Sequence, residues 1–434
     1  MLTGFTPEGF GYVVKRSGSA VGYCALSIGC GTRDEGSFPA GIAHFTEHAI
    51  FKGTAHRSSR SINSCLEKLG GELNAFTTKE ETVIHATVLK EDLSKALKLL
   101  VELATEPSFP TTEIEIEKGV VMDEIQSYKD SPADDIYDCF EERLFKGHPL
   151  ATPILGTLES VPLITVDDLK AYTAAGFIPS RMVLSMVADL PEERMVAMIS
   201  KAVCRKRQEI SPLRPSASGR NDNNSASGRN DSFLSFRANE VSREISMQSS
   251  SQFHITEKKD NHEANAVFGN FAPSLAEKRE RLVAGLLANI LGGPASNSIL
   301  GSILREKHGW VYGVEAAYTP YKETGIMAIS FGCDPSNLSK ASRTLRSTLA
   351  RFCEKPMAER TFASAKKQIL GQMAVSNANG EAQCLGLGKS MLAFGHVVPD
   401  SIVREEILSI TAEELRSLSE KIFGAEGYSS LIFV

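Results

Sequence analysis

Two histidines and a glutamate near the N-terminus have the spacing of a metal site. They stand in the segment from Phe38 to Phe51 as His44, Glu47 and His48, which reads His-x-x-Glu-His. Residues four apart lie on one face of a helix, so both imidazoles could bind one zinc ion. The glutamate beside them could then move a proton.

The order of this motif and its flanks favour a metal helix over a surface helix with two solvated histidines. The order reverses the commoner His-Glu-x-x-His and is typical of the inverted zincins. The flanks are largely apolar, with Ile42, Phe45, Ala49, Ile50 and Phe51. We expect Ser37 to cap this helix, because serine is a preferred N-cap residue.

A catalytic zinc ion usually has three protein ligands and one open position, so a third ligand must come from another element. The best candidate is a helix over residues 112–126, where Glu117, Val121 and Glu124 share one face. Glu124 is the candidate ligand, and Glu117, two turns earlier, would orient a histidine. Spacing alone leaves open an acidic helix with ordinary exposed glutamates.

Four blocks of the chain resemble the pitrilysin-like zinc peptidases, especially short bacterial members of the mitochondrial-processing-peptidase-like branch. They are residues 29–35, 41–54, 70–82 and 117–126. In that family the distal ligand is the second of two glutamates seven residues apart. The resemblance therefore implies that Glu124 is the third ligand and that Glu117 is a supporting carboxylate.

The resemblance also implies residues that contact the substrate. Asn74, Ala75 and Phe76 lie in the block that is similar to the family's substrate-binding strand. Arg305 and Tyr312 lie in a segment where the family places an arginine and a tyrosine facing the metal. Arg305 would hold a substrate carbonyl or the C-terminal side, and Tyr312 would donate a hydrogen bond to the oxyanion. Alternatively, the arginine ends a helix and the tyrosine packs on a strand edge.

Two departures from the family pattern concern substrate preference rather than the metal ligands. Ile84 and His85 stand where the family often has a tyrosine pair. We expect His85 to face solvent from a strand, with contact to substrate as the alternative. The turn at residues 292–298 lacks the arginine that is usual there.

Composition indicates an ordinary globular protein. The chain has 434 residues, enough for two or more domains, with 42% apolar and 23% charged residues. The net charge of -6 gives no basic footprint for nucleic acid, and no apolar run is long enough to span a bilayer. The start lacks the features of a signal peptide, and the eight cysteines show no Cys-x-x-Cys spacing. We therefore expect reduced thiols in a cytoplasmic protein without nucleic-acid or membrane partners.

The chain divides into two halves around a polar stretch. We expect a zinc-binding catalytic half over residues 1–204, a flexible polar linker over 205–261, and a related half without zinc over 262–434. The linker range is poor in large apolar residues, so it cannot offset its ordering entropy. Because the strand at 429–433 mirrors that at 183–187, we interpret the chain as a diverged duplication whose second copy has lost the metal motif.

Hydrophobic periodicity predicts an α+β fold in which each half is a mostly antiparallel sheet with helices packed on one side. The resemblance implies the same two-half fold, shared by processing peptidases and LuxS-like metallopeptidases. Strands are expected near 11–15, 21–29, 71–77, 81–89, 182–189, 264–271, 311–319, 325–333 and 428–433. Helices are expected near 38–52, 59–69, 91–104, 112–128, 133–145, 167–175, 276–291, 296–307, 335–353, 357–375, 380–394 and 411–423.

These observations predict a zinc-dependent endopeptidase that hydrolyses extended or unfolded peptides with Glu47 as general base. The substrate would pair with an edge strand. The resemblance implies a homodimer in which the zinc half of one chain faces the non-zinc half of its partner. The alternatives are a non-catalytic peptide-binding or scaffold subunit, a hydrolase of non-peptide amides, and a structural zinc domain. A heterodimer with a related chain, and manganese or cobalt as the metal, also stay open.

Overall fold

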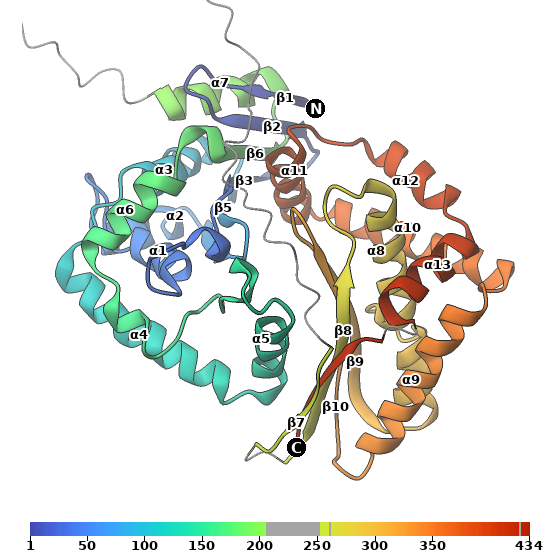
Figure 1. Ribbon diagram of the computed structural model, residues 1–434. Coiled ribbons are helices and arrows are strands. Elements are labelled where there is room, and N and C mark those ends of the chain that lie inside the picture. The colour runs from blue at the N-terminus through green and yellow to red at the C-terminus, as the bar shows by residue number, and fades with distance from the viewer. Residues whose placement is uncertain (205–251, 260–261, 425–426) are drawn as a thin grey trace, which may run out of the picture.

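The computed structural model describes residues 1–204, 252–259, 262–424 and 427–434. Two β-sheets with their own helices form two lobes that lie side by side (Figure 1). The first lobe is built from the chain before residue 205, and the second from the chain after residue 251. This architecture confirms the predicted α+β fold of two related halves.

The first sheet has six strands in the order β1-β2-β6-β3-β5-β4. Only β2 and β6 are parallel, and every other neighbouring pair is antiparallel. Its strands are β1 (Leu2–Phe5), β2 (Gly11–Arg16), β3 (Val21–Ile28), β4 (Glu72–Thr77), β5 (Thr82–Leu89) and β6 (Met182–Ala188).

The second sheet repeats this plan in the order β7-β11-β8-β10-β9, with β7 and β11 parallel. Its strands are β7 (His254–Glu257), β8 (Ala264–Ala272), β9 (Val311–Pro320), β10 (Gly325–Cys333) and β11 (Ser429–Phe433). Taken in chain order, β7 to β11 occupy the same places as β2 to β6. The two halves are therefore copies of one topology, as the similarity of their last strands predicted.

β7 corrects one boundary of the predicted linker. The predicted range of 205–261 includes His254–Glu257, which pair with β11. This strand has only four residues and alternates between exposed and half-buried positions, so it lacks the apolar run that marks a strand in sequence. Residues 205–251 of the predicted linker, with their internal repeat, lie outside the described residues.

The first lobe has seven α-helices, the first of which carries the predicted motif. They are α1 (Ile42–Ile50), α2 (Ser59–Glu67), α3 (Leu93–Thr105), α4 (Thr111–Lys129), α5 (Pro132–Leu144), α6 (Val166–Gly176) and α7 (Glu192–Val203). The second lobe has α8 (Lys278–Gly292), a π-helix η6 (Gly301–Lys307), α9 (Leu338–Glu354), α10 (Glu359–Ala378), α11 (Gly380–Phe394), α12 (Asp400–Ser409) and α13 (Ala412–Phe423). No helix in these described ranges is long and apolar enough to cross a membrane.

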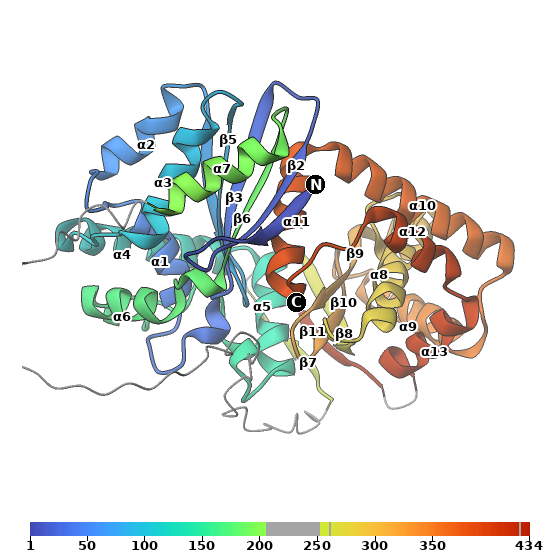
Figure 2. The ribbon, with the colours of Figure 1, turned by 90° about the horizontal axis from the view of Figure 1, so that it is seen from above.

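The two lobes exchange one helix each, which adds a second covered face to both sheets. α11 of the second lobe packs on β3 and β6 of the first sheet, and α5 of the first lobe packs on β8 and β11 of the second. Both contacts are apolar: Met391 lies with Val183, and Phe140 lies with Leu431. α5 and α11 occupy the same place in their halves, so the exchange is reciprocal (Figure 2).

The main core of the first lobe lies between its sheet and its own helices. Leu26 and Ile84 from the sheet are fully buried against Leu97 and Leu100 of α3, and Phe45 of α1 belongs to the same cluster. α1 contacts both β4 and α4. The helix with the histidine motif is thus fixed between an edge strand and the helix that carries the two predicted glutamates.

Candidate metal centre

α1 begins at Ile42 because of a glycine and a buried carboxylate. Gly41 precedes the helix at a φ of 88°, and a Cβ there would lie 2.7 Å from the carbonyl oxygen of Leu155. The carboxylate of Glu35 accepts hydrogen bonds from the backbone nitrogens of Gly41 and Ala43, each at 3.1 Å. The predicted cap by Ser37 is therefore wrong, because a buried acid from outside the helix satisfies its first N–H groups.

His44 and His48 lie on one face of α1 and meet Glu124 of α4. The Nε2 atoms of His44 and His48 lie 3.8 and 3.5 Å from Oε2 of Glu124. One possible ligand atom from each of the three residues lies within 4.8 Å of the others. Both histidine side chains are largely covered, whereas that of Glu124 is 44% exposed. The three predicted ligands are thus together, with solvent access from the side of α4.

Glu117 sets the orientation of His48. Its Oε1 lies 2.8 Å from Nδ1 of His48, and its Oε2 lies 2.5 Å from Nζ of Lys52. Burial acts against the ionised acid, yet the bonds from His48 and Lys52 lower the pKa of Glu117. An ionised Glu117 accepts a hydrogen bond from Nδ1–H of His48. We therefore assign Nε2 of His48 as the atom with the free lone pair.

His44 favours the neutral form that a metal ligand requires. Burial, with a smaller effect of His48, lowers the pKa of His44 to about 4. His48 behaves differently: burial acts to lower its pKa, but the hydrogen bond to Glu117 and the charge of Glu124 raise it. Nδ1 of His44 is buried without a hydrogen-bond partner among the described residues.

Glu47 lies beside the cluster and is held by the neighbouring strand. Oγ1 of Thr77, at the end of β4, donates to Oε2 of Glu47 at 2.6 Å. Burial raises the pKa of Glu47, while the Thr77 bond and the charge of His48 act to lower it. A buried carboxylate with a raised pKa beside candidate metal ligands has the position that a general base requires.

Thr77 and Lys52 were not predicted as site residues from the sequence, although a local pattern indicates the position of each. Thr77 follows Leu73 and Ala75 at the spacing of two that places side chains on one face of a strand. Both of those residues pack on the core near α1. Lys52 stands four residues after His48, which puts it on the ligand face just beyond the end of the helix.

The predicted substrate strand is indeed an edge strand. β4 pairs only with β5, and Asn74 and Phe76 are exposed on one face while Ala75 is half-buried on the other. His85 pairs with Glu381 of α11 at 3.0 Å, and its side chain is only 13% exposed. The prediction that His85 faces solvent is therefore wrong, because the exchanged helix covers this face of the sheet.

Arg305 and Tyr312 lie in the second lobe, away from the cluster. Arg305 lies in the last turn of η6, and Tyr312 stands at the start of the edge strand β9 with 59% of its surface exposed. Among the described residues, no hydrogen bond or ion pair joins either side chain to the histidines or to Glu47. Their predicted part in catalysis stays a prediction.

A cavity of about 710 Å³ lies between the lobes, next to the candidate centre. Its first-lobe wall includes Tyr128, one turn beyond Glu124 on α4, and the turn at residues 78–81 that follows β4. Its second-lobe wall includes Tyr321 and the end of α11. The cavity thus extends from the edge strand into the interface of the lobes.

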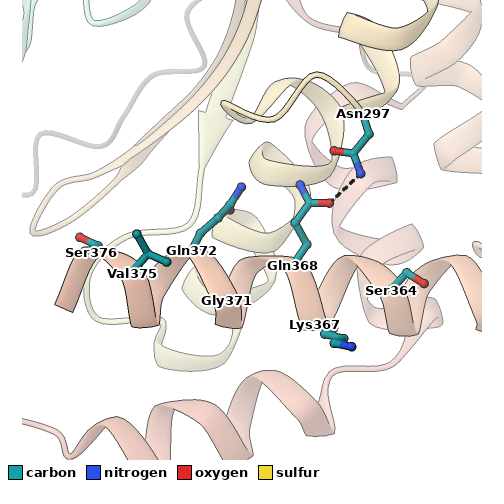
Figure 3. A pocket seen from close by; sticks show the side chains of 8 residues that line it. All are labelled: Asn297, Ser364, Lys367, Gln368, Gly371, Gln372, Val375 and Ser376. Atoms are coloured by element: carbon teal, nitrogen blue, oxygen red, sulfur yellow. Dashed lines mark hydrogen bonds between the residues drawn. The ribbon is translucent and has the colours of Figure 1, made fainter. Parts of the chain in front are cut away.

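The second lobe has a groove where its copy of the metal centre would lie. α10 and α8 hold the places of α4 and α1, and they pack together in the same way. The groove along α10 is lined by amides, small side chains and Lys367 (Figure 3), and Gln372 accepts a hydrogen bond from Asn289 of α8 at 2.6 Å. None of its eight lining residues is a histidine, cysteine or carboxylate.

The residues present in the first lobe fit a zinc ion. Two imidazole nitrogens and one carboxylate converge from two helices, and this donor set leaves a coordination position open in tetrahedral geometry. A carboxylate orients one histidine through its other nitrogen, as is usual for metal-bound imidazoles. Within the described residues this is the only such group of histidine, cysteine and acidic side chains.

Comparison with known proteins identifies related chains of similar length. An uncharacterized zinc protease of Bacillus subtilis is 28% identical over 410 residues, which cover 93% of this chain and 91% of that protein. An uncharacterized zinc protease of Mycobacterium leprae is 27% identical over 399 residues, covering 91% and 83%.

Solved structures share the fold at lower identity. A protease from Helicobacter pylori matches 100% of this chain and 98% of its own with a TM-score of 0.82 and 18% identity. A structure described as a peptidase M16 inactive domain from Pseudomonas fluorescens matches 100% and 97% with a TM-score of 0.81 and 19% identity. At these identities the likeness shows the fold alone.

Two family models match consecutive parts of the chain. The model of insulinase, peptidase family M16, matches residues 12–158, which contain the whole candidate metal centre. The model of the peptidase M16 inactive domain matches residues 163–369, which include only part of the groove along α10. The chain therefore belongs to the insulinase-like peptidase family M16, and its second half matches the model of that family's inactive domain.

Proposed function

We propose that this protein is a zinc-dependent endopeptidase that cleaves extended or unfolded peptides. The observation that carries the proposal is the meeting of His44, His48 and Glu124 with Glu47 at their side. Zinc held by the first three would supply a Lewis acid that acidifies water and polarises a peptide carbonyl. The relatives named as zinc proteases support this choice of metal.

Glu47 would do the proton chemistry. Its carboxylate would take a proton from the attacking water and give it to the leaving amine. The hydrogen bond from Thr77 fixes the carboxylate relative to β4. A peptide paired with that strand would therefore have a fixed position relative to the base. Arg305 and Tyr312 would reach the substrate only from a facing lobe, the latter to stabilise the oxyanion.

The edge of β4 favours a substrate in extended conformation. An added peptide would pair with the free backbone groups of Asn74, Ala75 and Phe76, because edge strands recruit partners through main-chain hydrogen bonds. Such pairing makes limited demands on sequence and excludes folded segments. Unfolded peptides are therefore the proposed class of substrate.

A homodimer would bring the second-lobe residues to the metal centre. Arg305 and Tyr312 are exposed, and among the described residues no ion pair joins either side chain to the first lobe, which suits residues that act on a neighbouring chain. A cytoplasmic location is the matching proposal for the compartment. It is supported by the eight cysteines, all of which are free thiols.

A non-catalytic peptide-binding subunit is the second candidate, because residues 163–369 match an inactive-type domain. The two candidates differ in what metal removal does. A peptidase should lose cleavage of unstructured peptides on treatment with a chelator and regain it with added zinc. A binding subunit should bind peptides equally well in both states and cleave none.

Glu124→Ala tests the ligand set directly. The variant should lose most bound zinc and all cleavage, because two histidines alone hold the ion weakly. Glu115→Ala is the matched control, since Glu115 is an exposed glutamate on the same helix that pairs only with Lys118. Full zinc content in Glu124→Ala would remove this residue from the site.

A further inference from the structure

The turns of two equivalent hairpins meet where the lobes touch. The turn at residues 78–81 joins β4 to β5, and the turn at residues 321–324 joins β9 to β10. Each is closed by the same bond, from Thr78 N to Glu81 O at 2.8 Å and from Tyr321 N to Thr324 O at 2.7 Å. The strand registers put a Lys-Glu pair at the same place in both turns, residues 79–80 and 322–323.

Arg33 joins the equivalent glutamates of the two turns. Its guanidinium is paired with Glu80 of the first lobe and with Glu323 of the second, where Oε2 accepts from Nη1 at 2.9 Å. The backbone nitrogen of Lys322 also donates to Oε1 of Glu80 at 3.1 Å. Although burial opposes it, the bond from Arg33 lowers the pKa of Glu323. The interface thus contains a charged bridge between the copies of one hairpin.

A buried group beside this bridge fixes the same turns. Nζ of Lys79 donates to the carbonyl oxygen of Thr152 at 2.6 Å and lies 3.5 Å from Oε2 of Glu141 on α5. Oη of Tyr321 donates to Oε1 of the same glutamate at 3.1 Å. Lys79, Glu141 and Tyr321 are all buried. The first turn therefore has few ways to move while the second turn stays in place.

The bridge connects to the proposed base by two short paths. On the first, Thr77 lies directly before the turn at residues 78–81 and donates to Glu47. On the second, the backbone nitrogen of Arg33 donates to the carbonyl oxygen of Lys79 at 3.0 Å, and Glu35, two residues later, caps α1. Both ends of the contact between Thr77 and Glu47 are thus tied to the bridge.

We propose that the β9–β10 turn of the inactive-type lobe positions the catalytic base of the first lobe, through Glu323, Arg33 and Glu80. Thr77 is then a positioning residue that fixes the Glu47 carboxylate, and Glu323 is a positioning residue that acts through the first turn. The inference rests on the proposed peptidase function. It assigns the second lobe a role in catalysis within one chain, apart from any contact with substrate.

The test compares kcat, KM and bound zinc of the full-length wild type with those of Glu323→Ala, Thr77→Val and the double variant, on one peptide that the wild type cleaves. Each single change should lower kcat about tenfold with unchanged zinc content, because small misplacement of a catalytic group is costly. The double variant should be no slower than the slower single variant, since both changes act on one contact.

Two controls separate positioning from general loss of structure. Thr77→Ser retains the hydroxyl and should restore kcat to within about twofold of wild type. Glu420→Ala removes an exposed ion pair with Arg416 in the same lobe and should leave kcat unchanged. Glu323→Gln replaces Glu323→Ala if the latter melts at a lower temperature than Glu420→Ala.

The outcomes are distinct. Wild-type kcat in Glu323→Ala, or losses that multiply to about a hundredfold in the double variant, would overturn the positioning role while the peptidase stands. A zinc-loaded wild type that cleaves no peptide would overturn the proposed function and this inference with it.

Discussion

Glu117 shows how strongly the candidate centre depends on a residue that need not touch the metal. It accepts a hydrogen bond from Nδ1–H of His48 and pairs with Lys52. It therefore determines that Nε2 is the nitrogen of His48 available to a metal ion. The resemblance assigned the ligand role to Glu124 and the supporting role to Glu117. In the fold, Glu117 is buried against α1 and Glu124 is partly exposed beside both histidines.

Glu117→Gln should weaken zinc binding by about 10- to 100-fold, because the amide no longer accepts a charge-assisted bond from His48. The measurement is a competition titration with a chelator of known affinity. Glu115→Gln, an exposed change on the same helix, is the control and should bind zinc as the wild type does. Equal affinity of the two variants would contradict the orienting role.

Glu35 should make stability depend on pH. Burial raises its pKa from 4.5 to about 8 in the folded chain, although the backbone bonds of Ala43 and Gly41 act to lower it. The folded state therefore binds more protons than the unfolded state between these values, and its stability falls as pH rises through them.

Glu35→Gln should remove that dependence, since glutamine keeps an acceptor for α1 but carries no proton to lose. Relative to wild type, its melting temperature should rise steadily from about pH 5 to about pH 8 and level off above that. Thermal melts of both proteins across this range are the measurement. A difference that does not vary with pH would show that Glu35 is ionised throughout.

Residue types predicted the centre well where a fixed spacing on one helix carries the information. His44, Glu47 and His48 needed only the helical repeat. Thr77 could not be predicted in the same way, because its partner Glu47 lies 30 residues earlier on another element. The predicted cap Ser37 was wrong, since the carboxylate of Glu35, two residues before it, accepts the hydrogen bonds of the first N–H groups instead.

At the scale of elements, periodicity located most strands and helices but missed those with weak patterns. β1 and β7 have four residues each with exposed positions, and α12 buries only Ile407. α12 follows Pro399 and is mostly polar, so its sequence has no strong apolar periodicity that would predict a packed helix. Short or exposed elements gain their stability from neighbours, which a local pattern does not record.

The exchanged helix α11 needs a small residue where it crosses the first sheet. A Cβ at Gly388 would lie 2.9 Å from Oγ of Ser27 and 3.0 Å from Oγ of Ser185, both buried on strands. Gly386, on the same helix, has no atom within 4 Å of such a Cβ. These two glycines form a matched pair.

Gly388→Ala should destabilise the protein by about 1–3 kcal/mol through overpacking. Gly386→Ala should stabilise it by up to about 1 kcal/mol, because alanine has the higher helix propensity. Denaturant unfolding of both variants is the measurement. Equal effects in the two variants would contradict close packing of α11 on this sheet.

At the scale of the whole molecule, duplication explains both the architecture and the division of labour. Both copies keep the strand order and each gives one helix to the other, whereas within the described residues a group of histidines and an acid that could hold a metal is found in the first copy alone. The sequence revealed the duplication through its repeated order of elements. It could not reveal the exchange, because no local pattern states which of two apolar sheets a helix will cover.

The proposed dimer predicts complementation between inactive chains. Glu47→Gln lacks the base, and Tyr312→Phe lacks the hydroxyl that a partner would supply. An equimolar mixture of the two variants should regain about a quarter of wild-type activity. Half of its dimers would be mixed, and each mixed dimer would have one intact site of two. Cleavage after co-refolding, with mass measured by sedimentation, is the experiment.

Glu47→Gln mixed with His48→Ala is the control and should recover nothing, because both changes affect the same lobe. Activity that stays absent in mixed dimers of Glu47→Gln and Tyr312→Phe would speak against a site shared between chains. A wild type that sediments as a 47.0 kDa monomer while it cleaves peptides would contradict the dimer itself.

The most direct test of the proposed zinc peptidase is cleavage of a panel of unstructured peptides by wild type beside Glu47→Gln, with bound zinc measured in both. We expect stoichiometric zinc in both proteins, cleavage by the wild type, and a cleavage rate at least about a hundredfold lower in the variant. Undiminished cleavage by Glu47→Gln would contradict its role as the base. Stoichiometric zinc without cleavage of any peptide by the wild type would contradict the peptidase itself.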